Sequence, residues 1–143
     1  MKKKAFTLTE ILTAVIIVAI LATLAIPQFI KTMEASKIRL AKTNLKLILA
    51  AERVYRNETG FFMPFNEDMS GRVATAEEII KYLGLDFPDL RKQALGKTPD
   101  FVYTINTTGG PRVDFSATAV RSRGGEVVRL EINSEGEITE VRE

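Results

Sequence analysis

The chain has 143 residues, enough for one domain, and a net charge of +2 that points to no class of partner. It contains no cysteine and no histidine, which excludes disulfides, thiolate nucleophiles, cysteine-type zinc sites and Ser-His-Asp catalysis. No phosphate-binding or dinucleotide-binding glycine motif occurs, so the sequence predicts no enzymatic activity, no catalytic residue, no metal site and no cofactor.

The charge is unevenly distributed along the chain. Residues 1–57 carry a net charge of +7, and residues 58–143 carry −5. Two interpretations stay open: the basic segment 31–56 of one copy faces the acidic part of another, or both surfaces are solvated. The acidic second part argues against a broad nucleic-acid surface, so no nucleic acid is expected as a partner.

The first predicted element is an apolar helix. Three lysines at 2–4 and one acid, Glu10, precede twenty residues (11–30) without a formal charge. Such a run spans about 30 Å as a helix, the thickness of a bilayer's hydrocarbon core. Pro27 lies near its end and predicts a kink, because proline removes a backbone donor from the helix interior.

The helix continues beyond Lys31 as an amphipathic segment, since no glycine occurs before Gly60. One helix is therefore predicted from Phe6 to about Asn57, with an apolar stripe that needs a cover. The expected stripe consists of Ile38, Ala41, Leu45, Ile48 and Tyr55, broadened by Leu47, Ala51 and Val54.

The rest of the chain, residues 58–143, predicts a small globular head. Residues 61–73 are expected to form a loop in which Phe61 and Phe62 pack against the sheet. Thr75 and Glu78 fit a capping box that starts a short helix, and residues 84–100 predict a linker with one helical turn. Period-two segments near 101–106, 113–119, 127–132 and 137–141 predict three or four antiparallel strands. Their inner face, through Tyr103, Phe115 and Leu130, would cover the helix, giving an α+β fold.

The start of the chain has two ordinary interpretations. A secretory signal peptide would be cut near Ala25, but Glu10 interrupts its apolar region and the helix continues beyond that point. A single-span membrane anchor explains the length of the run but gives Glu10 no role.

The stretch Ala5-Phe-Thr-Leu-Thr-Glu10 and the apolar helix after it resemble the leader of type IV pilins and type II secretion pseudopilins. This resemblance implies a five-residue leader, 1–5, that a membrane-bound prepilin peptidase removes between Ala5 and Phe6 and N-methylation of Phe6. Alanine stands where the family usually has glycine. Glu10 and Pro27 occupy the fifth and twenty-second positions counted from Phe6, where the family has its glutamate and often a proline.

The resemblance implies a filament subunit with a transmembrane or filament-core helix at 6–30, extended by the amphipathic half at 31–57. In the filament, Glu10 would pair with the amine that cleavage frees at Phe6 and would set the register between subunits. Expected partners are other copies of the chain, the peptidase, inner-membrane assembly proteins, minor pilins or pseudopilins, and membrane lipid before assembly. The precursor would sit in the bacterial inner membrane with its head outside the cytoplasm, and the filament would be a surface pilus or a periplasmic pseudopilus.

Three functions remain open at this stage: pilin, type II secretion pseudopilin, and monomeric membrane-anchored binding domain. The chain lacks tryptophan and the Asp-Pro-Trp-Gly-Asn-Pro-like stretch of major pseudopilins, and it also lacks the cysteine pair of many pilins. Asp86, Asp89 and Asp100 are candidate calcium ligands without EF-hand spacing, and surface acids are the favoured interpretation. Asn57 and Asn106 match the glycosylation acceptor pattern, which is common by chance.

Overall fold

The computed structural model describes residues 7–63, 73–108 and 114–143. The long helix α1 (Leu8–Thr59) comes first, and the short helices α2 (Ala76–Leu83) and α3 (Pro88–Ala94) follow. The chain divides into two compact units, Met1–Ile38 and Arg39–Glu143, so the end of α1 belongs to the same unit as the sheet. The α+β class with a long N-terminal helix is confirmed.

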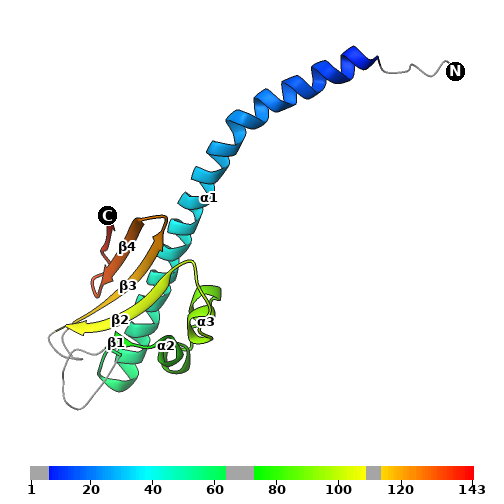
Figure 1. The fold of residues 1–143 in the computed structure, drawn as a ribbon. Helices are drawn as coiled ribbons and strands as arrows, with labels where there is room; N and C mark the ends of the chain where they lie inside the picture. The colour runs from blue at the N-terminus through cyan, green and yellow to red at the C-terminus, as the bar shows by residue number, and fades with distance from the viewer. Residues whose placement is uncertain (1–6, 64–72, 109–113) are drawn as a thin grey trace. The chain divides into compact units, whose positions relative to one another are not determined.

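The sheet has five antiparallel strands in chain order (Figure 1): β1 (Val73–Ala74), β2 (Val102–Thr108), β3 (Asp114–Arg123), β4 (Glu126–Asn133) and β5 (Ile138–Arg142). The prediction of three or four strands is corrected by β1, which pairs Val73 with Asn106 and Ala74 with Ile105. A two-residue strand is too short to show a period-two pattern, so β1 could not be predicted from the sequence.

Local signals explain where the helices begin and end. Gly60 follows α1 with a φ of 83°, a left-handed conformation that glycine adopts readily. The predicted capping box of α2 is confirmed: the Glu78 N–H donates to Thr75 Oγ1 at 3.3 Å, and the Thr75 N–H donates to Glu78 Oε2 at 3.0 Å. The predicted single turn in the linker is instead the seven-residue helix α3, which begins at Pro88.

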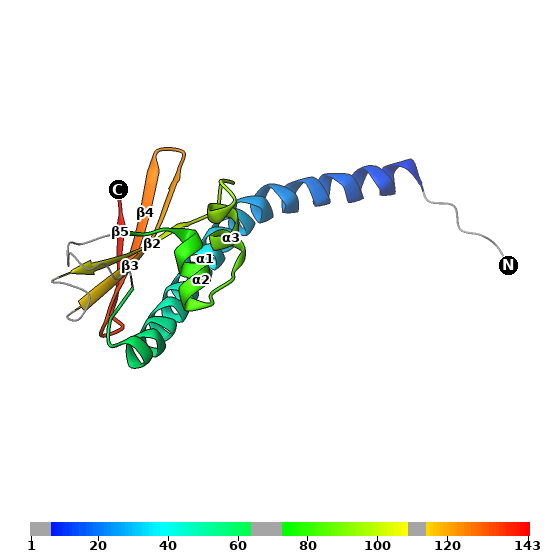
Figure 2. The same cartoon turned by 90° about the horizontal axis from the view of Figure 1, so that it is seen from below.

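The core of the 39–143 unit lies between the sheet and its three helical segments. The end of α1, α2 and α3 lie on the same side of the sheet (Figures 1 and 2). The predicted inner-face residues Tyr103, Phe115 and Leu130 are all buried. Phe62 is also buried and packs on Phe115 with ring centroids 4.8 Å apart, which confirms its predicted role.

A buried hydrogen bond between two side chains crosses this mostly apolar interface. The side-chain amide of Asn44, on α1, donates to the hydroxyl oxygen of Tyr103, on β2, at 3.0 Å. Burial raises the pKa of Tyr103 to about 12, so the hydroxyl stays neutral at physiological pH. The pair is thus a satisfied hydrogen bond in the core.

Candidate functional site

The first candidate site is the start of α1. Thr7 precedes the helix, and its Oγ1 accepts a hydrogen bond from the Glu10 N–H at 3.3 Å. Glu10 therefore lies in the first turn, with an exposed side chain, where a carboxylate interacts favourably with the helix dipole. The spacing Thr7-x-x-Glu10 is a helix-start signature, so the sequence itself carries a signal for where α1 begins. The expected cleavage and methylation site, Ala5 and Phe6, lies outside the described residues.

The apolar part of α1 has no cover within its own unit. Among the described residues, α1 is the one helix long and apolar enough to cross a membrane, a criterion that a signal sequence also meets. The hydroxyls of Thr13 and Thr23 donate to the carbonyls of Thr9 and Ala19, each at 2.8 Å. These polar groups are thus satisfied inside the helix, as an apolar surrounding requires. The helix is continuous through Pro27, and the kink there stays a prediction.

In the 39–143 unit, α1 has two apolar faces. One is buried under the sheet and comprises Ala41, Asn44, Leu45, Ile48, Leu49 and Glu52. The other, which we call the outer stripe, consists of Leu40, Leu47 and Val54, spaced seven residues apart and 57%, 47% and 57% exposed. The prediction that Leu47 and Val54 broaden the buried stripe is therefore wrong, because they point away from the sheet. Exposed basic residues at Arg39, Lys46 and Arg53 flank this stripe.

Glu52 is a buried acid that the periodicity did not single out. Its side chain is fully buried, and its Oε2 accepts a hydrogen bond from the Met63 N–H at 3.0 Å. Its Oε1 has no hydrogen-bond partner among the described residues. Burial raises the pKa of Glu52 to about 7, partly offset by the Met63 hydrogen bond.

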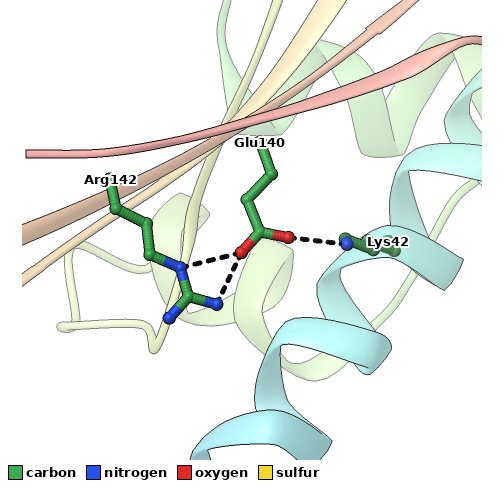
Figure 3. A network of polar contacts seen from close by, with 3 residues as sticks. All are labelled: Lys42, Glu140 and Arg142. Atoms are coloured by element: carbon green, nitrogen blue, oxygen red, sulfur yellow. Dashed lines mark hydrogen bonds and ion pairs between the residues drawn. The ribbon is translucent and has the colours of Figure 1, made fainter.

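An ion cluster joins α1 to the last strand (Figure 3). Lys42 Nζ donates to Glu140 Oε2 at 2.7 Å, while Arg142 donates to Glu140 Oε1 through Nε at 2.9 Å and Nη2 at 2.6 Å. We call Lys42, Glu140 and Arg142 the β5 ion cluster. The hydrogen bonds from Lys42 and Arg142 lower the pKa of Glu140.

Two of the three candidate calcium ligands, Asp86 and Asp89, make contacts that stabilise the fold. Asp89 is buried, which corrects its assignment as a surface acid; its two carboxylate oxygens accept the N–H groups of Asp100 and Phe101 at 3.1 and 3.2 Å. Asp86 pairs with Arg91. No group of three acids placed to hold a metal occurs within 7–63, 73–108 and 114–143.

The side chain of Gln93 forms hydrogen bonds with backbone groups of β2 that β1 does not reach. Its side-chain Nε2 donates to the Tyr103 carbonyl at 2.9 Å, and its Oε1 accepts the Tyr103 N–H at 2.8 Å. Asp89 and Gln93 lie one turn apart on α3, so this short helix satisfies the start of β2 as a neighbouring strand would.

Comparisons with known proteins agree with the N-terminal features. Residues 1–26 match the family model described as the prokaryotic N-terminal methylation motif. The chain is 38% identical over 68 residues to the type IV major pilin protein PilA of Myxococcus xanthus (strain DK1622). This match covers 48% of the chain and 31% of that relative, so the chain spans about a third of the relative's length. No solved structure gives a significant match.

A major pilin is a structural subunit, and the similarity to one supports the prediction that this chain is not an enzyme. The helix-and-sheet fold is consistent with that of pilins. The chain is thus similar to type IV pilins in its N-terminal methylation motif and over the 68 residues that match a major pilin.

Proposed function

We propose that the chain is the structural subunit of a type IV pilus-like filament, which polymerises through α1. The observation that carries this proposal is the exposure of α1 on apolar surfaces in both units. In the first unit, the apolar window is entirely uncovered. In the second, the outer stripe Leu40, Leu47 and Val54 is about half exposed although the opposite face is buried.

Uncovered aliphatic surface of this extent needs lipid or another protein surface. In the precursor, membrane lipid covers the segment 6–30, and the head lies outside the cytoplasm. In the filament, helices of other copies take the place of lipid and also cover the outer stripe. The basic residues beside that stripe disfavour pairing of two such segments side by side in parallel, because like charges would face each other. An uncharged apolar segment of another copy is the better partner.

Processing prepares this assembly. The motif match at 1–26 supports removal of residues 1–5 by a prepilin peptidase and methylation of the new N-terminus at Phe6. The freed amine then pairs with Glu10 of a neighbouring copy. This pair fixes the register of the apolar helices, which could otherwise shift along one another. On this proposal the chain consists of a leader at 1–5, a filament-core helix at 6–30, the amphipathic half of that helix at 31–57 and a head at 58–143. The pilin relative favours a pilus over a pseudopilus.

Mass spectrometry of the mature protein tests the proposal. The expected N-terminal peptide begins at Phe6 and carries one additional methyl group on its amine. Material sheared from the cells should contain the same processed chain in long fibres. A mature chain that begins at Met1, or a chain cut near Ala25, contradicts the proposal. A processed chain that is absent from sheared fibres but required for secretion identifies a pseudopilus subunit instead.

A further inference from the structure

The edge strand β5 carries charges on the side of the sheet that faces the helix. Ile138, Glu140 and Arg142 pair with Ile132, Leu130 and Val128 of β4, all of which are buried. Paired residues of antiparallel strands project from the same face. Two of the three inward positions of β5 are thus ionised side chains in the β5 ion cluster.

The free edge of β5 is otherwise able to pair with another strand. Val127 and Glu143 exchange both backbone hydrogen bonds, at 2.8 and 2.9 Å. Because such pairs alternate along an antiparallel ladder, the N–H and C=O groups of Ile138, Glu140 and Arg142 point away from β4. In the part of the chain that the structure describes, no strand follows β5 in the sheet.

The opposite edge is closed differently. Next to β2, the short strand β1 and the side chains of Asp89 and Gln93 occupy the backbone groups. Within residues 7–63, 73–108 and 114–143, neither a strand nor a side chain covers the outward backbone groups of β5 in this way, which leaves the side chains of β5 to oppose pairing there.

We propose that the β5 ion cluster prevents β5 from pairing edge to edge with β5 of a second copy. A second strand beside β5 would cover Glu140 and Arg142, whose side chains are now 25% and 57% exposed. Both charges would lose water, and the ion pairs that Glu140 already makes with Lys42 and Arg142 would supply no new interaction to offset that loss. Inward-pointing charge on an edge strand is a known means of blocking such pairing. Copies of the chain then associate through α1 and not through β5. The β5 ion cluster blocks strand pairing whether or not the chain forms a filament.

A cysteine reporter tests the inference, because the chain has no cysteine of its own. Val141→Cys places a thiol on β5, at a position that is 42% exposed in the native protein. The full-length chain is held in excess detergent, at about one chain per micelle, and mildly oxidised. In the parent, disulfide-linked dimer should be scarce. In Glu140→Thr/Arg142→Thr, it should rise about tenfold, as a gain of about 1.4 kcal/mol in association would produce.

A matched control removes the same charges from a central strand. Arg129→Thr/Glu131→Thr changes the outer face of β4 and leaves the net charge equal to that of the test variant. It should link no more than the parent does. Charge reversal, Lys42→Glu/Glu140→Lys/Arg142→Glu, keeps inward ions and should also stay unlinked.

Two results overturn the inference. One is a folded test variant, verified by circular dichroism, that links no more than the parent. The other is equal linking in the control on β4. If the threonine variant does not fold, Glu140→Gln/Arg142→Gln takes its place, because glutamine keeps a side chain of similar length. Its amount of disulfide-linked dimer is compared with that of the parent and of the control on β4 in the same way.

Discussion

The carboxylate of Glu52 on α1 accepts a hydrogen bond from the backbone N–H of Met63, eleven residues further along the chain. The bond ties the segment after Gly60 to the helix, next to the buried ring of Phe62. Arg56, one turn along α1, places its guanidinium carbon 4.6 Å from the centre of that ring. Glu52 is therefore at once buried, hydrogen-bonded and titratable near neutral pH.

The burial of Glu52 predicts an unusual pH dependence of stability. The folded state holds the proton up to a pKa of about 7, whereas the unfolded chain releases it near 4.5. Between these values the folded state binds more protons, so the free energy of unfolding falls as the pH rises. The total loss is about 3 kcal/mol, from 1.36 kcal/mol per pKa unit.

Urea unfolding between pH 4 and 8 measures this slope. Glu52→Gln, which cannot ionise, should flatten it and leave the protein more stable than the parent at pH 8. Glu135→Gln changes an exposed acid in the β4–β5 turn and should keep the parent's slope. A parent protein whose stability rises over this range would refute the assignment of Glu52.

Glu10→Leu tests the register role in the proposed filament. Membrane insertion should persist, because the change removes a charge from an apolar segment. Loss of the first-turn acid costs the helix only about 0.3–1 kcal/mol. The yield of sheared filaments should nevertheless collapse, while the amount of membrane-bound chain stays constant. Thr13→Val makes a comparable polar-to-apolar change one turn later and should assemble normally; normal filaments from Glu10→Leu would remove the register role.

The outer stripe predicts a separation of stability from assembly. Leu47→Ser changes a side chain that is 47% exposed, so the free energy of unfolding should shift by less than about 1 kcal/mol. Filament yield should fall, since a hydroxyl would be buried against another copy without a partner. Leu45→Ala, in the fully buried face, is the contrast: it should cost about 2–5 kcal/mol of stability. Both variants are compared by thermal unfolding and by the yield of sheared filaments. A Leu47→Ser chain that assembles as the parent does would contradict the role of the outer stripe.

Gln93→Ala removes both side-chain hydrogen bonds to the Tyr103 backbone. Water can reach part of this site, so we expect a loss of about 1–3 kcal/mol rather than unfolding. Hydrogen exchange of the Tyr103 amide should accelerate more than that of the central strand β3. Lys92→Ala, a change at a neighbour on α3 whose side chain is 44% exposed, should leave the Tyr103 amide protected.

The sequence predicts the elements of this fold because their signals are local. Gly60 ends the long helix, Thr75 and Glu78 start α2, and alternating residues predict the inner face of the sheet. The buried polar residues could not be predicted in the same way. Asn44 and Glu52 find their partners at Tyr103 and Met63, and helical periodicity says nothing of such distant groups.

Only part of the candidate site can be predicted from local sequence signals. The motif before Glu10 is visible in the sequence, as is the length of the apolar run. The exposure of Leu47 and Val54 is not visible, because periodicity gives an apolar face but not the surface that covers it. The contacts of Asp89 and Gln93 could not be predicted for a related reason: their partners are backbone groups of β2, which any sequence could supply.

The contact between Asn44 and Tyr103 has an evolutionary consequence. The aliphatic residues around it, such as Leu45 and Ile48, can exchange with one another at little cost if their total volume is kept. The amide and the hydroxyl cannot exchange separately, because either one alone would be a buried polar group without a partner. Across related chains these two positions should therefore covary, changing together to an apolar pair or not at all, while their neighbours drift.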